Sequence, residues 1–207
     1  MGRKLKAIES KINQAEKQLE EAKKELAEYM KRQKLPTPEI GGTIEIMDLT
    51  WTVLDKTEKG YLCIAESIDN ERKFDSNCND WEKSELREYL NVEFYHRLAV
   101  TVGQDNIIPF ERNLLSLDGQ TEYGTCEDRV SLLNVDEYRK YRSLLPNTDD
   151  YWWWLISPWS TLCNGYERLV TVVSPSGYVF SLNYYDGSYG VRPFCIFSSA
   201  IFESEDK

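Results

Sequence analysis

A seven-residue repeat of apolar side chains near the amino end constrains this chain more than any other feature. The repeat alternates spacings of three and four residues, and the positions between are mostly Lys, Glu, Gln and Arg, which favour helix. Such spacing predicts an amphipathic helix whose narrow apolar stripe must be covered by another surface. The stripe, called the seam, consists of Leu5, Ile8, Ile12, Ala15, Leu19, Ala22, Leu26 and Tyr29.

We expect the seam to be covered by further copies of the same helix. In a parallel arrangement Lys4 would face Glu9 of the next copy, and Lys11 would face Glu16, and both pairs attract. Alanine at two of the seam positions packs weakly, so a dimer and a trimer both stay open. The alternative is a helix that lies on the body of its own chain.

Prolines end the helical pattern and indicate a domain boundary. Pro36 and Pro38 in KLPTPEIGG disfavour helix and favour extended backbone, and Gly41-Gly42 adds conformational freedom. We predict a coiled-coil oligomerisation helix over residues 1–34, a linker over 35–42, a ligand-binding domain over 43–202 and an acidic tail over 203–207.

The domain has the pattern of an α+β fold. Short apolar runs with a turn at 58–60 predict strands, and the last third predicts a three-stranded meander over 168–174, 178–183 and 190–197. Helix starts are predicted at Asn79 or Asp80 and at Asn134, each followed by a glutamate that suits a capping box. The second helix would bury Val135, Tyr138, either Tyr141 or Arg142, and Leu145.

Charge and motifs exclude several function classes. The net charge of −10 argues against binding to nucleic acid or to anionic lipid, and we find no apolar run that would span a membrane. The first residues have no hydrophobic block, so we expect synthesis in the cytoplasm without a signal peptide. The five cysteines have no CxxC spacing and there is a single histidine, so we predict no catalytic residues, no metal and no cofactor.

Aromatic residues make up 13% of the chain and gather in its last third. In the strand YWWWLISP, Trp153 must point opposite to Trp152 and Trp154, so either both faces are covered or one is exposed for binding. The loops that follow are rich in Tyr, Ser, Asn and Asp, which antibody loops also use. They are either a binding surface or ordinary polar loops.

Four pieces of residues 40–200 resemble the variable proteins of diversity-generating retroelements of gut bacteria and their phages. They are DWEKSELREYLN, VSLLNVDEYRKY, the Trp-rich strand before Ser157-Pro158, and Gly190-Val191-Arg192-Pro193. The resemblance implies a C-type-lectin-type fold, related to the formylglycine-generating enzyme, that binds ligand without enzymatic activity. In that family a reverse transcriptase rewrites adenines near the carboxyl end of the gene, and the rewritten positions lie on a displayed face.

The same resemblance implies a variable region over about residues 155–189, with the Trp strand, Gly190, Arg192 and Pro193 as framework. Arg192 would hold a buried carboxylate or carbonyl. The partner would be an unknown protein or cell-surface ligand, bound by several copies at once, and the protein would be a phage particle component or remain in the cytosol. The binding face implied is Ile156, Ser160, Leu162, Asn164, Tyr166, Arg168, Asn183, Tyr184, Asp186 and Ser188.

Two alternatives come from the same comparison. The chain lacks the Glu-Pro-Asn motif of calcium-dependent lectins, but a copper oxidase of the formylglycine-generating type would need a cysteine pair, for which Cys163 and Cys195 are the candidates. The other alternative is an oligomeric scaffold with no ligand site.

Overall fold

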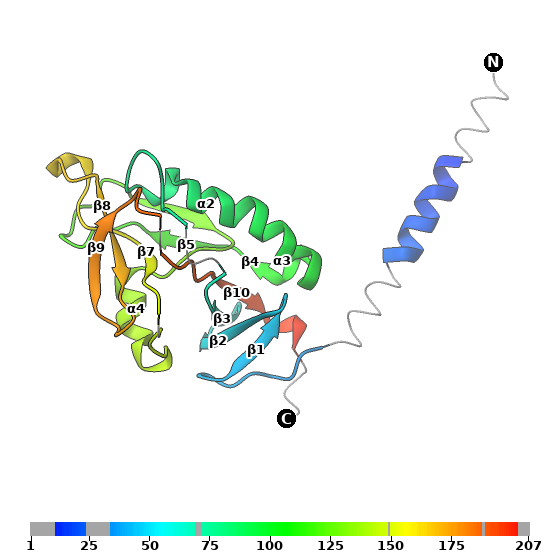
Figure 1. Cartoon of the computed structure of the whole chain (residues 1–207). Helices are drawn as coiled ribbons and strands as arrows, with labels where there is room; N and C mark the ends of the chain where they lie inside the picture. Colours follow the sequence, from blue (N-terminus) through cyan, green and yellow to red (C-terminus); the bar gives the residue numbers. More distant parts are fainter. Residues whose placement is uncertain (1–10, 24–33, 69–71, 149, 188, 203–207) are drawn as a thin grey trace, which may run out of the picture. The chain divides into compact units, whose positions relative to one another are not determined.

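The computed structural model describes residues 11–23, 34–68, 72–148, 150–187 and 189–202. The chain divides into two compact units (Figure 1): Pro38–Ala200 forms one, and Met1–Thr37 with Ile201–Lys207 forms the other. One boundary therefore falls between Thr37 and Pro38, within the segment that the prolines marked.

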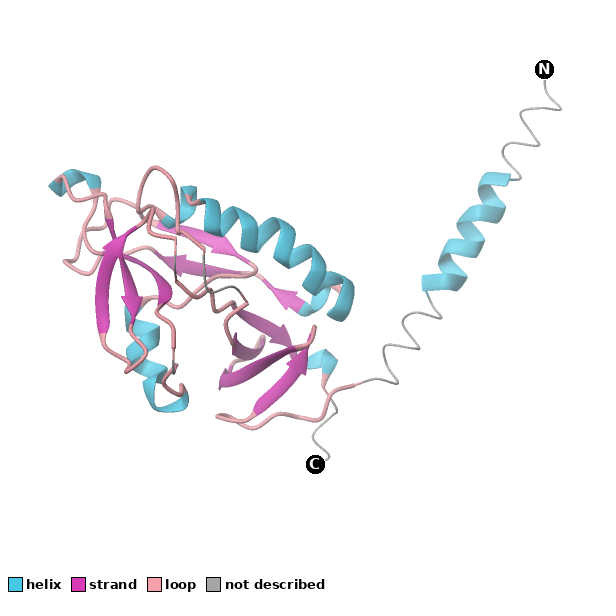
Figure 2. Cartoon of the chain, viewed as in Figure 1, coloured by secondary structure: helices cyan, strands magenta, loops and turns pink. Residues whose placement is uncertain are grey.

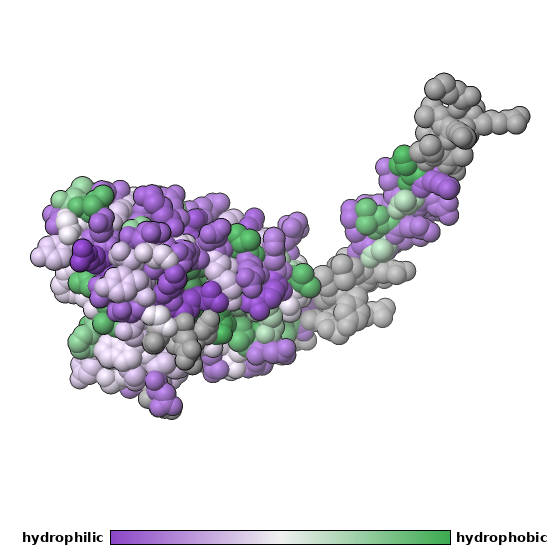
Figure 3. All heavy atoms as spheres, turned by 45° about the horizontal axis from the view of Figure 1, so that its top comes forward, coloured by the Kyte–Doolittle hydropathy of each residue, from purple (hydrophilic) through white to green (hydrophobic). Residues whose placement is uncertain are grey.

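Residues 11–23 are α-helical, as the heptad pattern predicts. Ile12 and Leu19 are 51% and 55% exposed, and apolar side chains lie among polar ones on the helix surface (Figure 3). Lys17 and Glu21, four residues apart, approach to 4.0 Å along the helix. Leu5, Ile8, Leu26 and Tyr29 lie outside the described residues, so association through the seam stays a prediction.

Acidic substitutions in the seam test that prediction. Changing both Ile12 and Leu19 to Asp in the full chain should lower the mass measured by light scattering at low protein concentration, because charges cannot be buried in a coiled-coil core. Asn13→Asp with Gln14→Asp adds the same charge off the seam and should leave the mass unchanged. Equal masses for both double variants would contradict the prediction.

The larger unit is a mixed α+β domain built on a five-stranded sheet (Figure 2). The strands lie in the order β1 (Thr43–Ile46), β2 (Leu49–Lys56), β3 (Gly60–Ala65), β10 (Phe194–Ser198) and β4 (Ile107–Ile108), and all neighbours are antiparallel. Gly60 begins β3 at φ 156°, where an added Cβ would lie 2.0 Å from the carbonyl oxygen of Phe197. Only glycine allows β3 and β10 to approach this closely there.

The predicted linker is partly bound to this sheet. The Gly41 N–H donates to the carbonyl of Val53 at 2.8 Å, and the Val53 N–H donates to the carbonyl of Gly42 at 2.9 Å. Gly41 adopts φ 83°, which makes the turn that brings the chain onto β2. The two glycines therefore shape a turn and do not simply add freedom.

A four-part helical segment follows a long connection from β3. It begins with the 3-10 turn η1 (Trp81–Lys83) and continues through α2 (Glu85–Tyr89), the π-helical turn η2 (Leu90–Phe94) and α3 (Tyr95–Val102). Asp80 caps η1 through the N–H of Glu82, and Ser84 caps α2 through the N–H of Arg87. Of the two predicted caps, Asp80 is therefore confirmed. The capping box predicted at Asn79 is wrong, because the side chain of Asn79 bonds to a different part of the chain.

The second predicted helix is confirmed with its cap. After η3 (Gln104–Asn106) and the hairpin β5 (Phe110–Asn113) with β6 (Thr125–Asp128), α4 runs from Val135 to Tyr141 and η4 covers Arg142–Leu144. Asn134 and Glu137 form the capping box. The buried face consists of Val135, Tyr138, Tyr141 and Leu145, so Tyr141 and not Arg142 faces the core.

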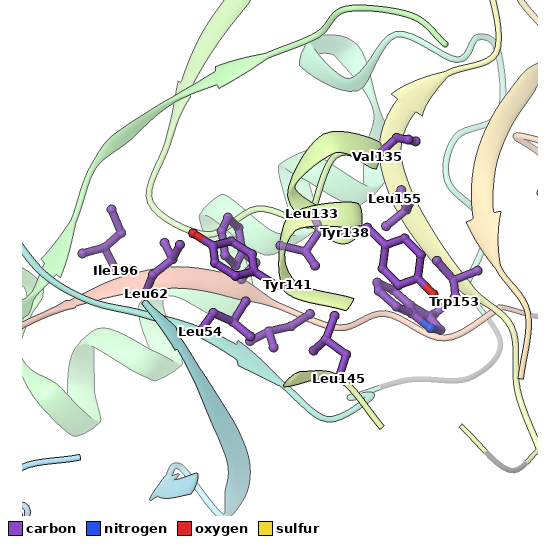
Figure 4. Packing of buried hydrophobic residues seen from close by; sticks show 13 residues of the cluster. Leu54, Leu62, Leu133, Val135, Tyr138, Tyr141, Leu145, Trp153, Leu155 and Ile196 are labelled. Carbon is purple, nitrogen blue, oxygen red and sulfur yellow. The ribbon is translucent and has the colours of Figure 1, made fainter. Parts of the chain in front are cut away.

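A second sheet carries the Trp-rich strand. Its order is β7 (Trp153–Pro158), β8 (Leu169–Val173) and β9 (Val179–Asn183), with η5 (Leu162–Asn164) between β7 and β8. Trp153 packs against Tyr138 of α4 with ring centroids 5.6 Å apart (Figure 4), while Trp154 packs against Phe74. Both are at most 2% exposed, so both faces of β7 are covered.

The predicted carboxyl-terminal meander is wrong in its third strand. β8 and β9 form the expected hairpin, but β10 leaves this sheet and pairs between β3 and β4 of the other one. Phe194, Cys195, Ile196 and Phe197 are all buried, which is the pattern of a central strand covered on both faces. This burial explains why the sequence of β10 is an unbroken apolar run. The short η6 (Ser199–Ile201) follows β10.

Candidate functional site

Two segments rich in Tyr, Asn and Ser meet beside the second sheet. Residues 159–168 connect β7 to β8, and residues 183–187 begin at the last residue of β9; together they are called the loop surface. The Tyr184 N–H donates to the carbonyl of Arg168 at 3.0 Å, which joins the two segments. The N–H groups of Phe74 and Asp75 donate to the carbonyl of Tyr184 at 2.9 and 3.1 Å. The rest of the domain therefore holds the loop surface through the main-chain atoms of the loops.

The buried side chain of Asn79 holds the first segment in the same way. Its amide nitrogen donates to the carbonyls of Ser160 and Leu169, each at 2.9 Å, and to that of Tyr166 at 3.3 Å. Its amide oxygen accepts from the hydroxyl of Tyr123 at 2.8 Å. Asn79 is 0% exposed, so these bonds are shielded from water. All of its contacts with the loop surface are to main-chain atoms, and none depends on which side chains the loop carries.

Asp118 also fixes the start of the same segment. Its carboxylate accepts from the hydroxyl of Ser160 at 2.7 Å and from the amide of Asn164 at 3.1 Å. Hydrogen bonds from Ser116, then from Ser160 and Asn164, lower the pKa of Asp118 below its ordinary value. Ser160 and Asn164 thus have structural partners in addition to their place in the loop.

Other side chains of the loop surface point into solvent. Leu162 is 55% exposed and Tyr166 61%, and Arg168 is also exposed. Among the described residues, no hydrogen bond or ion pair involves the side chains of these residues. Tyr185 is 53% exposed and its ring packs edge-on against Tyr184, with centroids 5.2 Å apart. These positions can change without breaking a contact that the fold needs.

Two residues of the predicted binding face are buried and must be removed from it. Ile156 is 0% exposed, because it lies in the middle of β7 and its N–H donates to the carbonyl of Leu133 at 2.9 Å. Ser160 is 2% exposed, since its hydroxyl turns inward to Asp118. Asn183, Tyr184 and Asp186 are half-buried, and Ser188 lies outside the described residues.

The predicted framework residues lie in the interior. Arg192 is 3% exposed, donates to the carbonyl of Ala65 at 3.0 Å and lies 5.0 Å from the ring centre of Trp153. This confirms the expected carbonyl partner. An added Cβ on Gly190 would lie 2.6 Å from the ring of Tyr151, so glycine is needed for this close packing.

A cavity of about 270 Å³ opens next to the loop surface. Leu162 and Glu167 line it from the loop, while Asp80, Glu122 and Tyr123 line it from elements that the sequence reasoning did not connect with the site. Glu122 accepts from the N–H of Cys163 at 3.0 Å, which ties the two walls together. No local motif marks these positions, since they are joined only by the folded chain.

The two cysteines of the copper alternative lie on different elements. Cys163 is exposed in η5, and its hydrogen bond to Glu122 raises its thiol pKa. Cys195 is fully buried in β10 opposite Cys63, and burial raises its thiol pKa. Within the described residues, no group of three or more His, Cys, Asp or Glu side chains is arranged to hold a metal ion.

Among the helices of the described residues, we find none with the length and hydrophobicity of a membrane span.

The hydrogen bond between Ser160 and Asp118 allows a local test. Ser160→Ala should raise the pKa of Asp118 toward its ordinary value of 3.8, because one hydrogen bond to the charged form is lost. Since the folded pKa is lowered, the contribution of this carboxylate is present above 3.8 and is lost as the pH falls through the lowered value. Carbon-detected NMR titration measures the shift. Ser176→Ala, far from Asp118 in sequence and without a bond to it, is the control, and an unchanged titration of Asp118 in Ser160→Ala would contradict the assignment.

Comparison with known proteins identifies a family. A family model described as a domain of unknown function, DUF6273, matches residues 58–199, which is more than half of the chain. No curated protein and no solved structure matches.

Proposed function

We propose that this chain, which belongs to the DUF6273 family, is a non-enzymatic recognition protein that binds ligand through the loop surface. The proposal rests on one observation. The side chain of Asn79 anchors residues 159–168 through hydrogen bonds to their main-chain carbonyls, while the side chains of Leu162, Tyr166 and Arg168 extend into solvent without partners among the described residues. Such a loop keeps its conformation when its side chains are exchanged. Tyrosine there supplies a large contact area at low entropic cost.

A loop that is anchored by its main chain and has free side chains suits a surface that is diversified by a retroelement. We propose that the domain is such a variable protein with a C-type-lectin-type fold. The ligand would be a protein or a cell-surface molecule. Assembly through the seam would let several shallow contacts act together, and effective concentration then raises the overall affinity without any new contact. The protein would act as a phage particle component or in the cytosol of a bacterium.

The DNA tests the diversification directly. We expect a reverse transcriptase gene nearby, together with a second copy of the DNA for residues 155–195 that differs from the first at adenines. Absence of both would remove the retroelement from the proposal. Binding is tested separately with a displayed library. Its members are randomised at Leu162, Tyr166, Arg168 and Asp186 and are selected for binding to a set of unrelated target proteins. A library in which most members unfold, or from which no binder emerges, would contradict the proposed surface.

A single exposed tyrosine provides the matching stability test. Tyr166→Ala should change the free energy of unfolding by no more than about 0.5 kcal/mol, because the ring touches water and holds nothing in place. Urea unfolding measures this value. Tyr123→Phe is the control, since it removes only a hydroxyl, but one that donates to buried Asn79, and it should be the more costly change. A larger loss for Tyr166→Ala would place that ring in the core.

A further inference from the structure

The strand β9 forms an edge of the second sheet, and no other strand of the described residues pairs with its outer side. The strand order ends at β9, which lies at the outer side of the sheet in Figure 1. From Tyr178 to Tyr185 the sequence is YVFSLNYY, with neither a charged residue nor a proline. Natural proteins usually protect such an edge with charge, proline or a covering element. The absence of these devices in this stretch indicates that the edge serves as a contact.

The hydrogen-bond register shows which backbone groups are free. The N–H of Ser174 donates to the carbonyl of Tyr178, and the N–H of Tyr184 donates to the carbonyl of Arg168, so the pairs at both ends of the hairpin are hydrogen-bonded. Because antiparallel pairs alternate, Phe180 and Leu182 also bond to β8. Val179, Ser181 and Asn183 therefore direct their N–H and C=O groups outward.

These outward groups have almost no partners among the described residues. The carbonyl of Asn183 accepts from the N–H of Asp186 at 3.0 Å, in the turn that ends the strand. The N–H and C=O groups of Val179 and Ser181 take part in no hydrogen bond within the described part of the chain. A further strand at this edge would satisfy them.

Large apolar side chains follow the same edge. Tyr178 is 67% exposed and Phe180 50%, with Leu182 and Tyr184 half-buried at the next two alternate positions. The ring of Phe180 packs edge-on against Trp152, with centroids 5.2 Å apart. Alternate residues of a strand share one face, so these side chains form a single row.

We propose that β9 pairs antiparallel with β9 of a second copy of this chain, about a two-fold axis at Ser181. The register places Val179 of each copy opposite Asn183 of the other, so the outward N–H and C=O groups meet. Phe180 then lies beside Leu182 of the second copy, and Tyr178 beside Tyr184. The row of apolar side chains becomes continuous across the axis and is buried on the same face in both copies.

Charge complementarity favours a second copy as the occupant. The guanidinium of Arg142 lies against Gly177 near the start of β9, and Asp186 follows its end. Antiparallel pairing brings the Asp186 end of each copy toward the Arg142 end of the other, twice by symmetry. Each chain carries a net charge of −10, so two copies repel overall and an uncharged strand is a favourable place for them to meet.

Proline substitution tests the pairing in the full chain. The parent is Ile12→Asp with Leu19→Asp, which should prevent any assembly through the seam. Sedimentation equilibrium of this parent should show a concentration-dependent dimer. Ser181→Pro should abolish it, because proline removes an outward N–H without removing a bond to β8. Ser181→Ala keeps that N–H and should remain dimeric.

A second disruptive variant keeps the result decisive. Phe180→Lys leaves the backbone intact and should also give a monomer, which covers the case that Ser181→Pro fails to fold by circular dichroism. A parent that stays monomeric at all concentrations, or a folded Ser181→Pro or Phe180→Lys variant that still dimerises, would overturn the proposal. Binding of an unrelated extended peptide at β9 of a monomeric parent would overturn it as well.

Crosslinking tests the position of the axis. In a Cys163→Ser background, Ser181→Cys should give a covalent dimer with a short bismaleimide, because the two Ser181 residues face each other at roughly 5.5 Å between Cα atoms. Ser176→Cys should not, since Ser176 lies in the turn before β9, five residues from Ser181, and the two-fold axis places its two copies at opposite ends of the paired strands. Crosslinking of Ser176→Cys but not Ser181→Cys would overturn this register. The background without an added cysteine is the blank.

Discussion

Replacement of Asn79 by Leu is expected to lower the free energy of unfolding by about 3 kcal/mol. The change removes donors from the carbonyls of Ser160, Tyr166 and Leu169 and an acceptor from the hydroxyl of Tyr123. Asn79 is fully buried, and a buried polar group without a partner costs about 1–3 kcal/mol. The Leu169 carbonyl keeps one bond, from the N–H of Trp159 at 2.9 Å, which limits the total.

The measurement combines urea unfolding with hydrogen exchange. Exchange of the amides in residues 160–168 should accelerate more than that of β3 or β10, because the loop loses its anchor while the five-stranded sheet keeps its contacts. Asn164→Leu is the control: Asn164 is exposed, and its loss should cost less and spare the rest of the loop. Equal effects of the two substitutions would show that Asn79 does not organise the loop surface.

Local patterns predicted the elements of the domain better than their partners. The capping box at Asn134 and Glu137 involves neighbours in sequence, so the start of α4 is readable without the fold. Asn79 stands in a similar pattern, but its side chain reaches residues 81 to 90 positions away, and tertiary contacts there outweigh the local preference. Nothing near Asn79 in the sequence records those partners.

The misplaced third strand has the same cause. Residues 190–197 follow the hairpin of β8 and β9 closely, which favours a meander, yet β10 pairs with β3 more than a hundred residues earlier. Short-range connection and long-range burial compete here, and the fully apolar run Phe194–Phe197 gains more between β3 and β4 than at a solvent-facing edge. The sequence did contain a signal for this placement. An unbroken apolar run indicates a strand covered on both faces, whereas a strand with one face in solvent alternates apolar and polar residues.

Exposure within the binding face was also only partly predictable. The family resemblance placed Ile156 and Ser160 in one binding face with Leu162 and Tyr166. Closeness in the sequence, however, does not show which residues lie inside a strand and which lie at the tip of a loop. Ile156 is covered by the sheet and Ser160 turns toward Asp118, whereas Leu162 and Tyr166 extend from the loop. The acidic walls of the neighbouring cavity come from three separate segments, so no sequence window contains them.

Replacement of Arg112 by Ala is expected to cost about 4 kcal/mol of unfolding free energy, the largest effect we predict. Arg112 is 1% exposed, and its guanidinium donates to both carboxylate oxygens of Glu137, at 2.6 and 2.5 Å. It also donates to the hydroxyl of Ser131 at 3.1 Å and to the carbonyl of Leu132 at 2.9 Å. Removing one partner of a buried ion pair leaves the remaining charge poorly compensated.

The position of the pair makes the effect reach beyond β5. Glu137 also accepts from the N–H of Asn134, so Arg112 fixes the carboxylate that completes the cap of α4. α4 covers Trp153 of the sheet from which the loop surface extends, and loosening its first turn should weaken that support. Thermal and urea unfolding of Arg112→Ala should therefore show a lower midpoint together with faster amide exchange in α4.

Arg139 offers a matched control on the same helix. It pairs with Asp136 at 3.1 Å, but the two side chains are 62% and 76% exposed. Solvent screens such a pair, and Arg139→Ala should cost no more than about 0.5 kcal/mol. If Arg112→Ala and Arg139→Ala proved equally mild, the buried network would contribute little to stability. The anchoring of α4 would then have to come from the apolar contacts of Val135, Tyr138 and Tyr141 alone.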